Sequence, residues 1–179
     1  MAQIIESRHT DYRAGEFVRV RNGWQEYALS SGQDVRKLDP AAAPVSTALG
    51  VLGMPGITGY AGLVYLGEPK PGETVVDLGS GSGMDAFVAA LMVGREGRVI
   101  GIDMTDEQLA KAERLRAAAG FAHVRFRKAY IEATGLPSAS CHAVISNGVV
   151  NLAPDKRAVF REAARLLKPG CRMALSDIV

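Results

Sequence analysis

The sequence predicts an α/β fold: a doubly wound, mostly parallel sheet over residues 72–179, preceded by a short β-rich segment. Three observations lead to this prediction. After Gly72, short β-branched runs alternate with helical patterns. A glycine-rich turn follows the first of these runs, as in folds that bind nucleotides. The composition also changes near Pro69, so we expect one domain over residues 1–71 and another over residues 72–179.

Composition sets further bounds. The chain has 179 residues, of which 47% are hydrophobic and 22% charged, which is ordinary for a soluble globular protein. A net charge of +2 gives no reason to expect a nucleic-acid or anionic-membrane partner. Cys141 and Cys171 form neither a disulfide framework nor a zinc-binding spacing, so we expect no metal site and a cytoplasmic protein. We see no secretion signal and no apolar run long enough to cross a membrane.

The first seventy residues contain turn signals between short apolar runs. Strands are expected at residues 4–5, 17–21 and 24–29, separated by glycine-containing turns. Residues 40–62 are rich in alanine, glycine and proline, and they are expected to be helical in part.

After Gly72 the pattern alternates regularly between strand and helix. The expected strands are residues 74–78, 98–103, 124–126, 143–146 and 172–178. The expected helices cover residues 85–93, the stretch from Thr105 to Gly120, and the apolar positions between Val159 and Leu167. Thr105 and Gln108 have the spacing of a capping box, and Gly120 is suited to end its helix. Units of this kind form a parallel sheet with right-handed crossovers.

The strongest local signal is the glycine-rich turn after the first of these strands. Asp77 lies in the strand just before the turn, and Gly79, Gly81 and Gly83 follow at alternate positions. Glycine is needed where the backbone turns sharply against a ligand. Met84 stands where a dinucleotide fingerprint would have its third glycine, which favours an adenosyl ligand without pyrophosphate.

A second acidic residue ends the next strand. Asp103 is placed to accept hydrogen bonds from both hydroxyls of a ribose. The alternative is that Asp103 caps the following helix, but Thr105 already fills that position. An acid, a glycine turn and a second acid in this order are more specific than any one of them.

Residues 72–179 resemble class I S-adenosylmethionine-dependent methyltransferases, and among them the arsenite methyltransferase-like group. The resemblance implies a Rossmann-like core, S-adenosyl-L-methionine as cofactor, and methyl transfer to a small-molecule acceptor. The matching segments are residues 75–85 (VVDLGSGSGMD), 99–105 (VIGIDMT), 126–132 (FRKAYIE), 145–156 (ISNGVVNLAPDK) and 166–170 (LLKPG).

The resemblance also implies which residues bind the cofactor. The glycine turn would follow the methionine part, the residues after the second strand would hold ribose and adenine, and Asn147 would lie near the sulfonium. The complete expected set is Asp77, Gly79, Ser80, Gly81, Gly83, Asp103, Met104, Ile131, Glu132 and Asn147. We assign no catalytic residue from the sequence.

The chain departs from the arsenite enzymes at one position. Where those enzymes have an arsenic-binding cysteine after the Ser-Asn of the fourth strand, this sequence has Gly148. A thiophilic substrate needs two or three convergent thiolates. We therefore expect that arsenite is not an efficient substrate, and that Cys141 and Cys171 are small buried apolar residues.

Residues 1–72 resemble a different family, the zinc-independent medium-chain dehydrogenase/reductases. The matching segments are residues 23–28 (GWQEYA), 35–40 (VRKLDP) and 49–63 (LGVLGMPGITGYAGL). This part corresponds to the end of their substrate domain and the helix that leads to their cofactor domain. We interpret the chain as a fusion at a shared strand, with an N-terminal fragment that is expected to be only partly ordered.

Two alternatives to an active methyltransferase stay open. One is an NADPH-dependent reductase fragment, and the other is a non-catalytic module that binds an adenosyl ligand. The family usually continues past the fifth strand, whereas this chain stops at Val179, so the expected core is truncated and turnover is expected to be weak. A homo-oligomer is compatible with the sequence.

Overall fold

The computed structural model describes residues 1–177 and divides into two compact units, Met1–Ile57 and the part that begins at Thr58. Residues 58–71, which the sequence analysis grouped with the N-terminal fragment, thus pack within the second unit.

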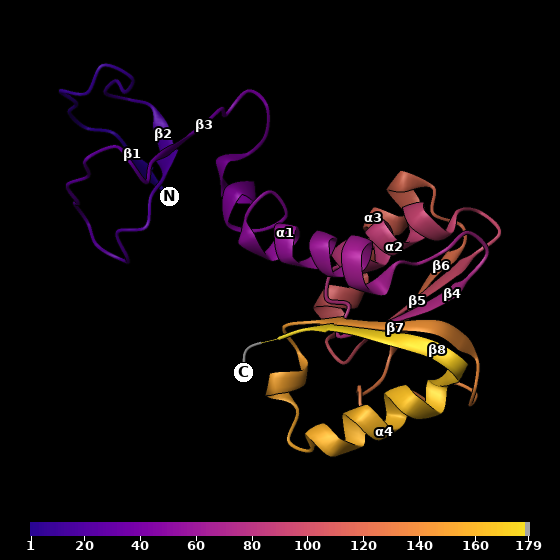
Figure 1. Cartoon of the computed structure of the whole chain (residues 1–179). Coiled ribbons are helices and arrows are strands. Elements are labelled where there is room, and N and C mark those ends of the chain that lie inside the picture. The colour runs from indigo at the N-terminus through magenta and orange to yellow at the C-terminus, as the bar shows by residue number, and fades with distance from the viewer. Residues whose placement is uncertain (178–179) are drawn as a thin grey trace. The chain divides into compact units, whose positions relative to one another are not determined.

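The second unit is built on a five-stranded parallel sheet (Figure 1). Its strands are β4 (Thr74–Leu78), β5 (Arg98–Asp103), β6 (Val124–Lys128), β7 (Cys141–Asn147) and β8 (Leu167–Ser176). Their spatial order is β6-β5-β4-β7-β8, and every neighbouring pair is parallel. The predicted doubly wound α/β fold is confirmed.

Helices cover both faces of this sheet (Figure 1). They are α1 (Met54–Ala61), the π-helical turn η2 (Gly62–Gly67), α2 (Met84–Val93), α3 (Asp106–Ala119), the short η3 (Val150–Leu152) and α4 (Lys156–Leu166). Alternate side chains of β4 point to opposite faces, so Val75 joins the core beneath α2 while Val76 joins the core beneath α4. Both valines are fully buried, as expected for a central parallel strand.

Helix α3 ends as predicted but begins differently. Gly120 adopts a left-handed conformation (φ +71°), and its N–H reaches the last carbonyls of the helix. Thr105 occupies the N-cap position, yet its side chain makes no capping hydrogen bond. Its backbone N–H instead donates to Oδ1 of Asp103 at 2.9 Å. The expected capping box therefore does not form, because the Asp103 carboxylate accepts the Thr105 N–H that a capping box would pair with Gln108.

The fifth strand starts earlier than expected. β8 begins at Leu167 and includes the Lys-Pro-Gly segment, where its register with β7 shifts between Cys141 and Ala143. This irregularity accommodates the proline, which cannot donate to a regular ladder. The expected end of the strand, Ile178, lies outside the described residues.

Arg172 on β8 fixes the segment between η2 and β4. Its guanidinium donates to the backbone carbonyls of Gly67 and Glu68 and to both carboxylate oxygens of Glu73, at 3.1 and 2.6 Å. This ion pair lowers the pKa of Glu73. These contacts explain why η2, which precedes the sheet's first strand in sequence, packs with its last two strands, β7 and β8.

The first unit contains little buried apolar surface. Its three strands, β1 (Ala2–Gln3), β2 (Phe17–Arg19) and β3 (Arg36–Leu38), pair antiparallel. The 3₁₀ helix η1 (Val45–Leu49) follows them. The expected strand at residues 24–29 does not form, because no neighbouring strand pairs with it, and Trp24 and Leu29 are fully exposed. The expected strand at residues 4–5 lies two residues earlier.

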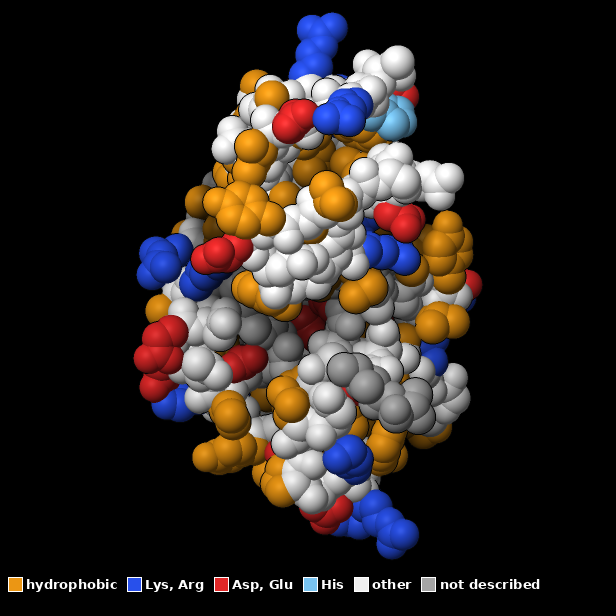
Figure 2. All heavy atoms as spheres, turned by 90° about the vertical axis from the view of Figure 1, so that its left-hand side faces the viewer, with side chains coloured by type: hydrophobic (Ala, Val, Ile, Leu, Met, Phe, Trp, Pro, Cys, Tyr) orange, Lys and Arg blue, Asp and Glu red, His pale blue; other side chains and the backbone are white. Residues whose placement is uncertain are grey.

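Charged side chains of both signs are interspersed on the face shown in Figure 2. Among residues 1–177, no helix is both long and apolar enough to span a lipid bilayer.

Buried Glu162 on α4 holds the loop before β7. Its carboxylate accepts from the backbone N–H and the hydroxyl of Thr134, at 2.8 and 2.6 Å, and from two nitrogens of Arg165, both at 2.7 Å. These donors, Arg165 foremost, lower the pKa of Glu162 from 4.5 to about 2. The ionised form therefore stabilises the fold.

We predict that Glu162→Gln lowers the free energy of unfolding by about 2 kcal/mol at neutral pH. The depressed pKa means that the contribution is complete above about pH 4.5 and is lost as the pH falls through about 2. Urea unfolding at several pH values measures the difference. Glu113→Gln is the matched control, because Glu113 pairs with Arg116 at the same spacing but is 53% exposed. Equal effects of the two substitutions would contradict the prediction.

Candidate functional site

The carboxyl ends of the parallel strands gather the predicted residues at one edge of the sheet. Asp77 lies near the end of β4, Asp103 ends β5 and Asn147 ends β7. β4 lies between β5 and β7, and the chain crosses over from β6 to β7 on its other side. This reversal is the topological switch point at which open α/β sheets bind ligands.

The glycine turn has the geometry that its sequence predicts. Gly79, Gly81 and Gly83 all have positive φ angles, +78°, +51° and +95°. A Cβ on Gly79 would lie 2.5 Å from the Val149 side chain, whereas a Cβ on Gly81 would meet nothing within 4 Å. Packing against the Val149 side chain thus requires glycine at the start of the turn, and open space lies beside Gly81 in its middle.

Asp103 ties this turn to α3. Its Oδ2 accepts from the backbone N–H of Gly81 at 2.8 Å, while Oδ1 accepts from Thr105. A carboxylate has about four acceptor positions, so both oxygens can still accept from a ligand hydroxyl. The side chain is only half-buried and is held in one orientation.

Asp77 is the most deeply buried acid of the site. It is 2% exposed, and its Oδ2 has no hydrogen-bond partner within residues 1–177. Burial, followed by repulsion from Asp85, raises the pKa of Asp77 well above its usual range, and the backbone N–H of Ala86 opposes this. Such a carboxylate is stabilised by a cationic partner.

Asp85, in the first turn of α2, is a site residue that the sequence analysis missed. Its Oδ1 is buried without a hydrogen-bond partner among the described residues. Burial raises the pKa of its carboxyl, while the Asn147 side chain opposes this. The available signal was its position two residues after the last glycine of the turn.

Unpartnered buried polar atoms concentrate at this edge. Within residues 1–177 they are Asp77 Oδ2, Ser80 Oγ, Asp85 Oδ1 and Asn151 Oδ1. All four belong to strand ends or to the turns and helices that begin there. Buried polar groups nearly always have partners, so such a cluster indicates a place where a polar ligand binds.

The remaining predicted residues also follow strand ends. Met104 comes directly after β5 and is 62% exposed. Ile131 and Glu132 lie in the turn after β6, where Ile131 packs against the core and Glu132 is half-buried.

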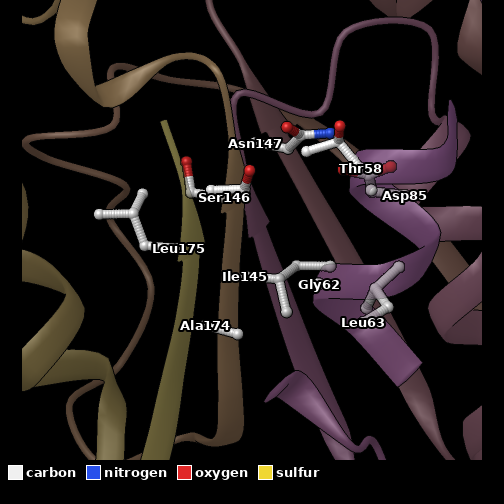
Figure 3. A pocket seen from close by; sticks show the side chains of 11 residues that line it. Thr58, Gly62, Leu63, Asp85, Ile145, Ser146, Asn147, Ala174 and Leu175 are labelled. Carbon is white, nitrogen blue, oxygen red and sulfur yellow. The ribbon is translucent and has the colours of Figure 1, made fainter. Parts of the chain in front are cut away.

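A small pocket of about 10 Å³ lies between α1–η2 and the carboxyl ends of β7 and β8 (Figure 3). Apolar side chains of Leu63, Ile145 and Ala174 lie at one end of it, and Thr58, Asp85 and Asn147 lie together at the other. The complete lining is Thr58, Gly59, Gly62, Leu63, Asp85, Ile145, Ser146, Asn147, Ala174, Leu175 and Ser176.

Both cysteines lie near the opposite edge of the sheet. Cys141 begins β7, is fully buried and contacts the carbonyl of Leu166 through its Sγ at 3.3 Å. Burial, and next the Cys171 thiol, raises the pKa of Cys141 to about 11. The expectation of a buried residue is confirmed for Cys141, whereas Cys171 is half-buried.

Comparison with known proteins agrees with this geometry. Residues 69–179 match the sequence profile of a methyltransferase domain, which is more than half of the chain. The chain belongs to this methyltransferase domain family. The family profile begins shortly before β4 and includes every predicted cofactor-binding residue.

Two kinds of relative match this methyltransferase-domain chain. An arsenite methyltransferase from Halobacterium salinarum is 49% identical over 119 residues, covering 63% of this chain and 30% of that protein. An NADPH-dependent curcumin reductase from Escherichia coli is 41% identical over 102 residues, covering 57% of this chain and 30% of that protein. Both expected resemblances are confirmed, and the chain spans about a third of the length of these relatives. The two aligned regions overlap, because they cover 63% and 57% of this chain and so together exceed its full length.

A solved structure shares the fold of the methyltransferase domain. An arsenic(III) S-adenosylmethionine methyltransferase from Chlamydomonas reinhardtii is 42% identical, with a TM-score of 0.58, covering 62% of this chain and 40% of that protein. A geranyl diphosphate methyltransferase in complex with S-adenosylmethionine is 26% identical, with a TM-score of 0.62, covering 68% of this chain and 48% of that protein.

Proposed function

We propose that this chain binds S-adenosyl-L-methionine at the carboxyl edge of its sheet and transfers the methyl group to a small-molecule acceptor. The observation that carries the proposal is the cluster of unpartnered buried polar atoms around the glycine turn. Its acidic members, Asp77 and Asp85, suit a ligand that carries an ammonium and a sulfonium. Family membership and the relatives' names support the same cofactor.

The residues present fit this cofactor. The open side of Gly81 leaves room for the methionine part beside Gly79, Ser80 and Gly83, and Asp77 would balance the ammonium. Asp103 would accept from the ribose hydroxyls. Met104, Ile131 and Glu132 would border the adenine, and Asn147 would lie near the sulfonium. When bound, the cofactor supplies an already activated methyl group, so the protein's task is to orient the acceptor and exclude water.

A reductase fragment is the second candidate, favoured by the identity with the curcumin reductase. Met84 at the third glycine position argues against dinucleotide binding. NADPH titrated beside the adenosyl ligands would distinguish the two candidates.

We predict that S-adenosylhomocysteine binds the folded chain and that Asp103→Ala weakens this binding by roughly 1.5–3 kcal/mol, about tenfold or more. The substitution removes the ribose acceptor and the support of the Gly81 N–H. Calorimetry measures both dissociation constants. Asp106→Ala is the control, because Asp106 is exposed and pairs with Lys128. Failure of the folded wild-type chain to bind, or an Asp103→Ala affinity equal to wild type, would contradict the proposal.

We also predict that the chain does not methylate arsenite efficiently. Cys141 lies at the start of a seven-residue strand whose other end carries Asn147, so its thiol is about 20 Å from the proposed cofactor site. The high pKa of Cys141, about 11, further disfavours the thiolate. Chromatographic analysis of methylated arsenic species tests this. Turnover that disappears in a Cys141→Ser/Cys171→Ser variant would show that the thiols do present arsenic to the site.

A further inference from the structure

The first compact unit, Met1–Ile57, contains a pocket of its own. Its volume is about 280 Å³, close to the lower end of the range for sites that hold small molecules. β2, β3, the loop after β3 and η1 all contribute to its walls. None of the residues predicted to bind the methyltransferase cofactor lines this N-terminal pocket, so its ligand needs a separate explanation.

Two arginines lie opposite each other in the N-terminal pocket. Arg19 on β2 pairs with Arg36 on β3 in the antiparallel register, and both side chains line the pocket. Among residues 1–177, neither guanidinium has a hydrogen-bond or ion-pair partner. Like charges directly opposite each other destabilise a strand pair. An anion that contacts both guanidiniums would offset this repulsion.

The other two charged residues of the lining already have partners. Nζ of Lys37 donates to Oε1 of Glu16 at 2.6 Å and lies 5.5 Å from the centre of the Tyr12 ring. Asp39 is the acid of the lining, and its Oδ1 accepts from the backbone N–H of Ala41 at 2.8 Å. The two arginines are therefore the groups with which an anionic ligand can pair.

Much of the remaining wall is apolar. Leu38 lies two residues after Arg36 on the same face of β3, and Val45 and Ala48 belong to η1. Ala48 is buried, and Leu38 and Val45 are half-buried. A ligand that fills the pocket would place its anionic group at the arginines and an apolar group against these side chains.

We propose that the N-terminal pocket binds a small phosphate monoester with an apolar or aromatic group, and that Arg19 and Arg36 hold its phosphate. A phosphate monoester has three terminal oxygens and up to two negative charges, so it can pair with both guanidiniums. A carboxylate has a single charge and two oxygens. Since the lining lies entirely within residues 19–52, the inference does not depend on the proposed methyltransferase cofactor.

Four simple probes test the two parts of this site by calorimetry on the full chain. Phenyl phosphate carries both the phosphate and the ring, inorganic phosphate lacks the ring, phenol lacks the phosphate, and benzoate carries a carboxylate instead. The titrations are made at pH 8, above the second pKa of a phosphate monoester, which is about 6. We expect phenyl phosphate to bind about tenfold or more tightly than each of the other three.

Substitution of each arginine tests which residues hold the phosphate. Arg19→Gln and Arg36→Gln should each weaken phenyl phosphate binding about tenfold or more, because each removes a charged hydrogen bond. Neither should lower the melting temperature of the free chain, since each removes one of two opposed like charges. Arg21→Gln is the matched control: Arg21 is exposed in the same unit and does not line the pocket, so binding should stay within about twofold.

Three results would overturn the inference. The first is that phenyl phosphate does not bind the folded wild-type chain, or binds no better than inorganic phosphate or phenol. The second is benzoate binding as tight as that of phenyl phosphate, which would contradict the assignment of a phosphate. The third is an equal effect of all three arginine substitutions, which would show general attraction to a basic surface.

Discussion

The carboxylate of Asp77 is buried near the end of the central strand β4, and one of its oxygens has no hydrogen-bond partner among residues 1–177. Much of the arrangement of the site follows from this burial. β4 lies between β5 and β7, and the Asp77 side chain is 2% exposed, so water has little access to it. Asp85 and Asp103 add repulsion rather than compensation. A fold that buries one carboxylate near two others favours the binding of a cation. The cation would offset both the cost of burying the charge and the repulsion between the carboxylates.

The segment before β4 shows how two resemblances meet in one structure. Helix α1 and the turn η2 resemble the reductases, yet from Thr58 onward they pack with the methyltransferase sheet. Arg172 on β8 holds the end of η2 and also pairs with Glu73, just before β4.

The sequence predicted well those features that depend on neighbouring residues. The strands β4 and β5 and the turn at Gly79–Gly83 follow from β-branched runs and from glycines with positive φ. Thr105 is the N-cap residue of α3 as predicted, but the predicted capping box does not form, because the carboxylate of Asp103 accepts the Thr105 N–H. Asp85 was missed because its significance comes from Gly59 and Asn147, which are distant in sequence.

Proton release on cofactor binding tests the central claim most directly. Calorimetry of S-adenosylmethionine binding in two buffers of different ionisation enthalpy counts the protons released. Because a cation lowers the raised pKa of Asp77, we expect S-adenosylmethionine binding to release protons at pH values above the usual titration range of an aspartate, and less release with weaker binding in Asp77→Asn. Binding without proton release throughout a pH series, or undiminished binding by Asp77→Asn, would contradict the account.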